Sequence, residues 1–169
     1  MMKKYVSLSL FLFFGFLVHA QSDACACCTE DHTAFDFWVG DWEVTKTDGS
    51  AAGKNTIEKI EGSCVLRENW TSANGNYTGT SYNFFNLSTK QWEQLWIDNA
   101  GNHLKLKGNR IDNHMILSSD EFTHTDGKVY KNRITWTLNE DGSVRQLWEV
   151  LQGNEVASVA FDGLYRKKG

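Results

Sequence analysis

Residues 91–109 read QWEQLWIDNAGNHLKLKGN, and they hold two segments of alternating side chains on either side of a turn. In Gln91–Asp98 every second residue from Trp92 to Trp96 is a large ring or a carboxamide, which is the period of a β-strand. Asn99–Asn102 places Asn beside Gly, and these residues accept the positive φ of tight hairpin turns. His103–Asn109 resumes the alternation. The stretch therefore predicts an antiparallel β-hairpin.

The same pattern recurs from Phe35 to the end of the chain. The predicted strands are Trp42–Lys46, Lys54–Ile60, Val65–Thr71, Tyr77–Asn86, Gln91–Asp98, His103–Asn109, His114–Ser118, Lys128–Leu138, Val144–Leu151 and Glu155–Arg166. Short Gly-containing turns join nearly all of them, and the chain has no Pro to interrupt a strand ladder. Only residues 29–37 suggest a helical turn. An open meander of this length would leave two edges, whereas closure removes them. We predict an all-β domain over residues 35–169, a closed antiparallel up-and-down β-barrel of about ten strands. A sandwich with Greek-key crossings is the alternative, but it needs a long connection that the sequence lacks.

The start of the chain has the features of an export signal. Lys3 and Lys4 precede an apolar run over residues 5–18, and small residues end near Ala20. The run is shorter than a membrane-spanning helix, which needs about 20 residues. We therefore predict a signal peptide over residues 1–20, a periplasmic or secreted protein, and no membrane span.

The charge balance excludes one class of partner. The 169 residues include 17 Lys and Arg against 21 Asp and Glu, for a net charge of −4. The basic residues form no stripe, so the chain lacks the electrostatic footprint of a nucleic-acid-binding protein. We expect no nucleic-acid partner.

All four cysteines lie beyond the signal: Cys25, Cys27 and Cys28 in a Cys-rich tail over residues 21–34, and Cys64 in the barrel domain. An even number of cysteines in an exported chain favours disulfides. The one long-range bridge available joins Cys64 to one of the other three. The alternative is a soft-metal site completed by His32, but the spacing fits no zinc pattern. We expect disulfides, no metal and no cofactor.

Three predicted strands carry similar tetrapeptides that end in Trp. In each, the residue two positions before the Trp shares its face of the sheet. Large rings usually face inward, so the accompanying amides and carboxylate are expected inside as well. The predicted ligand-binding residues are Glu68, Trp70, Trp92, Gln94, Trp96, Trp136, Gln146 and Trp148. Aromatic walls with a few polar anchors are typical of small-molecule sites. A plugged barrel with a polar layer is the alternative, and we favour the cavity.

Catalytic signals are few. Glu68 is the best candidate for a buried carboxylate, and an apolar interior would raise its pKa as in general acids. We favour another interpretation, a salt bridge from Glu68 to Arg133 or Arg145. His103 and His114 flank a predicted hairpin and would be able to pair across it. These signals do not settle whether the protein is an enzyme.

The segment Phe35-Asp36-Phe37-Trp38-Val39-Gly40-Asp41-Trp42 resembles the opening of a bacterial family of unknown function (DUF1579-like), which includes secreted members. The resemblance continues through Gly62-Ser63-Cys64, Glu68-Asn69-Trp70, Gly79-Thr80-Ser81, Trp92-x-Gln94-x-Trp96-x-Asp98 and Phe161-Asp162-Gly163-Leu164-Tyr165-Arg166, so it covers nearly all of the barrel domain.

This family is similar to the lipocalins and fatty-acid-binding proteins, the calycin-like barrels. In lipocalins a Gly-x-Trp on the first strand closes the barrel floor beneath an Arg from near the chain end. The resemblance implies that role for Gly40, Trp42 and Arg166, and it implies a barrel for hydrophobic ligands. The related haem-binding nitrobindins use a late His as the iron ligand. No His follows His124 here, so haem is not expected.

These observations lead to two hypotheses in which the barrel binds a small molecule, beside a third in which a plugged barrel serves as a structural or interaction protein. The first is an exported carrier that binds a small apolar or amphipathic molecule in the barrel. The alternative is a small-molecule enzyme of the isomerase, hydratase or lyase type that uses Glu68 in the same cavity.

Overall fold

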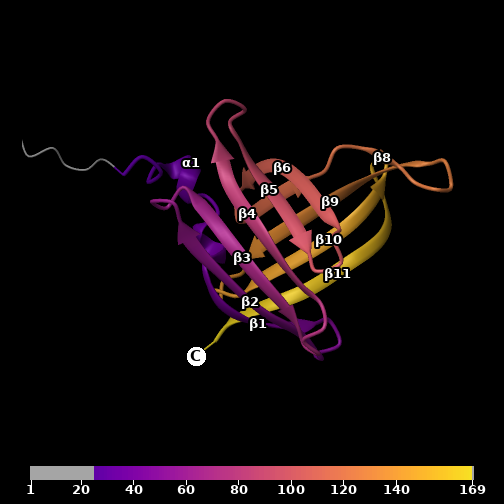
Figure 1. Cartoon of the computed structure of the whole chain (residues 1–169), viewed down its shortest axis with the longest axis horizontal. Helices are drawn as coiled ribbons and strands as arrows, with labels where there is room; N and C mark the ends of the chain where they lie inside the picture. The colour runs from indigo at the N-terminus through magenta and orange to yellow at the C-terminus, as the bar shows by residue number, and fades with distance from the viewer. Residues whose placement is uncertain (1–24, 169) are drawn as a thin grey trace, which may run out of the picture.

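The computed structural model describes residues 25–168, which form eleven strands and two short helical turns (Figure 1). In chain order the elements are α1 (Glu30–Thr33), η1 (Asp36–Trp38), β1 (Gly40–Lys46), β2 (Ala51–Ile60), β3 (Val65–Ser72), β4 (Thr78–Asn86), β5 (Gln91–Asp98), β6 (His103–Ile111), β7 (His114–Ser118), β8 (Phe122–Thr123), β9 (Val129–Leu138), β10 (Val144–Gln152) and β11 (Glu155–Lys167).

Ten of these strands close into an antiparallel barrel. Each strand pairs with its neighbour in the chain from β1 to β7, and β9, β10 and β11 continue the meander. Closure comes from β11, which pairs with β1 in a register that sets Val44 opposite Tyr165. The predicted up-and-down barrel is therefore confirmed, and the sandwich is excluded.

The predicted strand bounds agree closely with the structure. Gln91–Asp98 and His114–Ser118 begin and end where the alternation does. The additional strand β8 has only two residues, Phe122 and Thr123, which pair with the start of β9. Two residues are too few to show a period, so no sequence pattern predicts this strand. The predicted signal peptide, residues 1–20, lies outside the described residues.

Aromatic rings fill one end of the barrel, which we call the floor. Phe35 and Trp38 enter it from the segment before β1 and stack with ring centroids 5.0 Å apart. Phe35 also meets Trp92 and Trp136 edge-on, at 5.6 Å and 5.1 Å. Trp42 donates its indole N–H to the Trp38 carbonyl at 2.8 Å. The helical turns expected within residues 29–37 therefore supply a plug for the floor.

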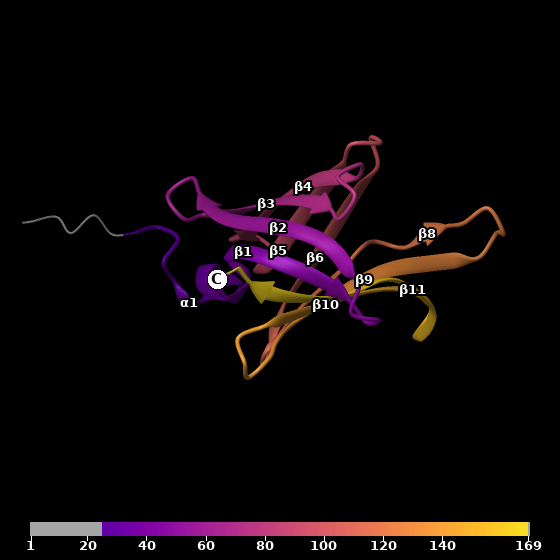
Figure 2. The same cartoon turned by 90° about the horizontal axis from the view of Figure 1, so that it is seen from below.

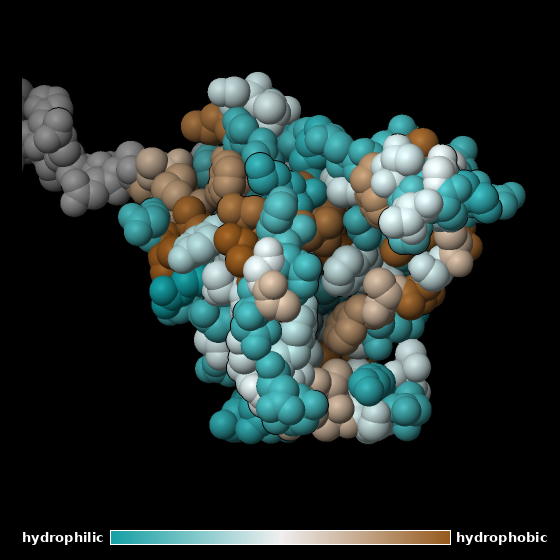
Figure 3. All heavy atoms as spheres, turned by 45° about the vertical axis from the view of Figure 1, so that its right-hand side comes forward, coloured by the Kyte–Doolittle hydropathy of each residue, from teal (hydrophilic) through white to brown (hydrophobic). Residues whose placement is uncertain are grey.

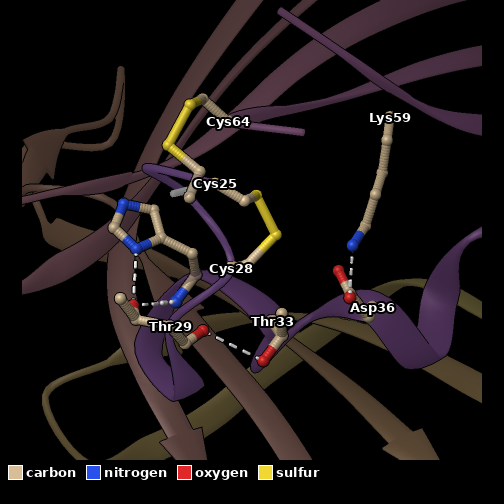
Figure 4. Close-up of a disulfide and its surroundings, with 9 residues drawn as sticks. Cys25, Cys28, Thr29, Thr33, Asp36, Lys59 and Cys64 are labelled. Carbon is tan, nitrogen blue, oxygen red and sulfur yellow. Dashed lines mark hydrogen bonds and ion pairs between the residues drawn. A yellow bond between two sulfur atoms is a disulfide. The ribbon is translucent and has the colours of Figure 1, made fainter. Parts of the chain in front are cut away.

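Two disulfides and several polar contacts hold residues 25–38, which we call the plug segment (Figure 4). Cys27 is bonded to Cys64 in the β2–β3 turn, and Cys25 to Cys28 within the segment. The Asp36 carboxylate forms an ion pair with Lys59 of β2. The expected long-range bridge to Cys64 is therefore present. Since all four sulfurs are used in disulfides, the Cys-rich tail offers no thiolates for a metal.

The two ends of the barrel differ. Figure 2 shows α1 and the C-terminal end of β11 at one end, with the β8–β9 hairpin projecting beyond the other. On the face shown in Figure 3, hydrophobic residues lie scattered among hydrophilic ones, some of them on that projection. No helix formed by residues 25–168 is long and apolar enough to cross a membrane.

Candidate functional site

A cavity of about 320 Å³ occupies the half of the barrel opposite the floor. Its wall is mainly aromatic and aliphatic, with one carboxyl group and a few hydroxyls and amides. The lining residues are Glu68, Trp70, Ser72, Tyr77, Gln94, Trp96, Leu104, Ile134, Gln146, Trp148, Ala160, Phe161 and Tyr165. The exposed residues Tyr77 and Ala160 lie at its opening. This volume is at the lower end of the range of small-ligand sites.

The structure brings six of the eight predicted ligand-binding residues together in this wall. The three pairs Glu68 and Trp70, Gln94 and Trp96, and Gln146 and Trp148 all line the cavity. The strand period placed both members of each pair on the inner face, as expected.

Trp92 and Trp136 lie elsewhere. Both are almost fully buried, at 2% and 1% exposure, and both pack against Phe35 in the floor. The indole N–H of Trp92 donates to the Asp31 carbonyl of α1 at 2.9 Å. Their inward orientation agrees with the prediction, but their height along the barrel places them below the cavity.

Inward-facing glycines make room for the rings of the wall. A Cβ at Gly79 would lie 2.1 Å from the Trp96 ring, and a Cβ at Gly53 would lie 2.8 Å from the Trp70 ring. Since real Cβ atoms do not approach so closely, these two indoles lie against the barrel wall only because the neighbouring strand carries no side chain there. The two glycines thus let the indoles lie close to the barrel wall, which leaves the centre of the cavity open.

Two polar groups fix other parts of the wall. Asn132 accepts a hydrogen bond from the indole N–H of Trp148 at 2.8 Å. At the base of the cavity the Tyr165 hydroxyl donates to the side-chain oxygen of Gln146. Burial, together with the nearby Glu68 carboxylate, raises the pKa of Tyr165 well above its usual range, so this phenol stays protonated.

Glu68 is the one ionisable carboxyl group among the described residues of the wall, and only 5% of it is exposed. Asn55 donates to its Oε1 at 2.7 Å, and Ser81 donates to its Oε2 at 2.6 Å. Neither donor carries a charge. The predicted salt bridge is wrong: Arg133 pairs with Glu149 and Arg145 with Asp162, on the outer side of the barrel.

A backbone carbonyl fixes the direction of the hydrogen bonds that lead to Glu68. The Leu66 carbonyl can only accept, so the Asn83 amide nitrogen must face it, at 3.1 Å. The same nitrogen donates to the Ser81 hydroxyl at 2.9 Å, which directs the hydroxyl proton to Glu68. The Asn83 oxygen accordingly accepts from the Gln94 amide nitrogen at 2.7 Å. The Gln94 amide thus uses its nitrogen in this chain and keeps its oxygen for other donors.

This environment raises the pKa of Glu68 from 4.5 to about 7. Loss of water around the buried carboxyl group is the largest cause, and it outweighs the hydrogen bonds from Ser81 and Asn55, which lower the pKa. The residue therefore changes its charge near neutral pH.

The floor closure differs by one residue from the one that the resemblance implied. Trp42 is buried beneath the ammonium group of Lys167, which lies 5.4 Å from the ring centroid. Arg166 pairs with Glu43 across the sheet and is exposed. Side chains alternate along β11, so a residue next to the buried Tyr165 must face outward. Gly40 has a φ of 140° and lies against the Lys167 side chain, which supports its predicted structural role.

The predicted histidine pair is also not formed. The β6–β7 register sets His114 opposite Ile111, whereas His103 lies at the other end of β6, opposite Ile97. His114 instead contacts the Thr137 hydroxyl at 2.9 Å. Within the described part of the chain no group of three His, Cys, Asp or Glu side chains is placed to hold a metal ion.

Sequence reasoning missed the polar residues that support Glu68. Asn55, Ser81 and Asn83 are each at most 2% exposed. A signal for them was present, because Asn55 is two residues before the apolar Ile57, and Ser81 and Asn83 are four and two residues before Phe85. Polar residues in phase with an inner face are candidates for a buried network.

The chain matches no protein-family model and none of the curated proteins with which it was compared. The geometry of the cavity is therefore the basis for assigning a function.

Proposed function

We propose that this protein is a carrier that binds one small apolar or amphipathic molecule in the barrel cavity. The observation that supports it most is the combination of an open cavity of about 320 Å³, walls of Trp70, Trp96 and Trp148, and one buried carboxyl group. Burial of apolar ligand surface against these rings would supply the affinity, and the few polar groups would supply the selectivity.

The wall does not resemble an interior that is filled by its own side chains. Packed protein cores leave few voids larger than a water molecule. Here the floor is packed in that way by Phe35, Trp38 and Trp136, yet the other half of the same barrel stays open. The contrast within one barrel favours a binding space over a plugged one.

Export is the expected setting for this carrier. The two disulfides, Cys25–Cys28 and Cys27–Cys64, fit an oxidising compartment such as the periplasm or the cell exterior. The predicted signal peptide over residues 1–20 points the same way. We therefore propose that the carrier acts outside the cytoplasm.

Tryptophan fluorescence during titration with a panel of small apolar and amphipathic molecules tests the proposal. A ligand in the cavity should quench the emission of the wall. Ala160→Trp, which narrows the opening, should abolish that response, whereas Ala157→Trp on the exposed part of the same strand should keep it. A panel without any saturable response, or an equal response from both variants, would contradict a carrier.

One observation also favours an enzyme. Glu68 has a pKa of about 7 and lines the cavity, and a general acid or base works best when its pKa lies near the working pH. An isomerase, hydratase or lyase activity that depends on this carboxyl group would be lost in Glu68→Gln while ligand binding remained. Turnover at the wild-type rate in that variant would remove Glu68 from the chemistry.

A further inference from the structure

We propose that the ligand is an amphipathic organic cation, an ammonium group on a short apolar chain, whose charge lies against the Glu68 carboxylate. This inference deepens the carrier function proposed above and depends on it. Three features of the cavity carry it: its unused acceptors, its charge and its rings.

Two acceptor groups of the cavity wall, the Glu68 carboxylate and the Gln94 side-chain oxygen, keep free lone pairs. A carboxylate has about four lone-pair sites, and Asn55 and Ser81 use one each. The Gln94 side chain donates to Asn83 through its nitrogen, so its oxygen remains free to accept a hydrogen bond. A ligand group that lies against Glu68 and Gln94 would therefore donate hydrogen bonds to these oxygens.

The charge of the wall selects among donors. Its described residues include one acidic side chain, Glu68, and none that is basic. An ionised carboxylate that has left water without a cation nearby is costly, and a cationic ligand would remove that cost. An anion such as a fatty-acid carboxylate would meet a like charge at Glu68.

The rings favour the same class of ligand. Trp70, Trp96 and Trp148 all line the space beside the carboxyl group, on β3, β5 and β10. Indole faces attract ammonium groups, and the attraction grows when the site excludes water. The same rings cover an alkyl chain through its apolar surface. The cavity can therefore hold both parts of one small amphipathic cation.

Proton binding at Glu68 gives this inference a second readout. The carboxylate must be ionised to pair with a cation, so protonation competes with the ligand below pH 7. Tyr165 faces it from β11, and Tyr77 at the opening lies within its electrostatic reach. The pKa of each phenol is raised, so neither changes charge between pH 5 and 8. Affinity for a cation should therefore fall by up to about tenfold per pH unit below pH 7.

The experiment compares three probes that differ only in their head group: octylammonium, octan-1-ol and octanoate. Their dissociation constants are measured by tryptophan quenching and calorimetry at pH 8 and at pH 5.5. We expect octylammonium to bind at least tenfold more tightly than octan-1-ol at pH 8, octanoate to bind most weakly, and the preference for octylammonium to shrink at pH 5.5.

Variants locate the effect. Glu68→Gln should bring octylammonium and octan-1-ol to equal affinity, whereas Glu43→Gln, an exposed carboxyl on β1, should change neither. If Glu68→Gln does not fold, the affinity of the wild-type protein for octylammonium at pH 8 and at pH 5.5 still tests the role of the carboxylate. Equal binding of octan-1-ol and octylammonium, or tighter binding of octanoate, would contradict a cationic ligand but not the carrier function. Failure of all three probes and of the wider panel would overturn the carrier as well.

Discussion

Glu68 is a carboxyl group that the fold removes from water without giving it a positive partner. Its two neutral donors, Asn55 and Ser81, satisfy part of its hydrogen-bonding capacity but do not offset the loss of hydration. A protein keeps such a group more readily when the group has a use, and perturbed carboxyl groups cluster at functional sites. The unpaired state of Glu68 leads to two predictions that need no ligand.

The first prediction concerns pH and stability. The folded chain holds the Glu68 proton up to about pH 7, whereas the unfolded chain loses it near pH 4.5. Between these values unfolding releases a proton, so the free energy of unfolding should fall as pH rises, by about 3 kcal/mol for a shift of this size. Urea unfolding at pH 5 and pH 8 measures it.

Two variants separate this contribution from the other titrating groups. Glu68→Gln should flatten the fall, because the amide does not titrate, whereas the exposed Glu43→Gln should leave it in place. If the wild-type protein and Glu68→Gln lost the same free energy over this range, Glu68 would not be a buried, unpaired acid.

The second prediction concerns the hydrogen bond from Ser81. This donor lowers the pKa of Glu68, so Ser81→Ala should raise that pKa further. An NMR titration of the Glu68 side-chain carbon measures the change directly. Thr71→Ala, on the exposed face of β3, is the control and should leave the titration unchanged. A lower pKa in Ser81→Ala would contradict the fixed direction of the hydrogen bonds.

Among the elements, β4 shapes the cavity because it has no side chain at Gly79. Gly79 lies where a Cβ would overlap the Trp96 ring of β5. Gly79→Ala should therefore push the indole away from the wall and destabilise the barrel by about 2 kcal/mol, the typical cost of overpacking. It should also weaken ligand binding. Unfolding and binding are measured on the same sample.

A double-mutant cycle shows whether the ring is the cause. Trp96→Phe removes the ring atoms that meet the new Cβ, so in its background Gly79→Ala should cost much less. An equal cost in both backgrounds would mean that the backbone of β4, and not Trp96, resists the substitution.

The plug segment depends on its longer disulfide. Cys27–Cys64 closes a sequence separation of 37 residues, whereas Cys25–Cys28 closes only 3. In the chain-entropy picture the first loop is worth about 4 kcal/mol and the second no more than about 2. The double variant Cys27→Ser with Cys64→Ser should therefore lower the midpoint temperature of thermal unfolding more than Cys25→Ser with Cys28→Ser does. The reverse order would show that the segment is anchored mainly by its local bridge.

At the scale of the whole molecule, the sequence predicted the barrel well because most of its strands are short, alternating and bounded by turns. The same alternation placed Glu68, Gln94 and Gln146 inside. The same alternation predicts that Arg145 faces outward, because it adjoins the inward Gln146. The salt-bridge prediction is wrong for Arg133 too, because this residue adjoins the inward Ile134 and faces outward.

Other features were beyond strand periodicity. The period tells which face a residue occupies but not its height along the barrel, so Trp92 and Trp136 were placed in the cavity wall although they pack in the floor. Their height follows from Phe35 and Trp38, which enter the barrel from a segment without strand character. The direction of the hydrogen bonds around Glu68 depends on the Leu66 carbonyl, a backbone atom that no side-chain pattern reports.

The indole N–H signals of the protein's seven tryptophans offer the most direct test of the central claim, that this barrel holds a ligand above a packed floor. In a nitrogen–proton NMR titration with octylammonium, the signals of Trp70, Trp96 and Trp148 should shift and saturate together, and those of Trp38, Trp42, Trp92 and Trp136 should stay in place. Shifts confined to the floor tryptophans, or no saturable shift from any probe of the panel, would contradict it.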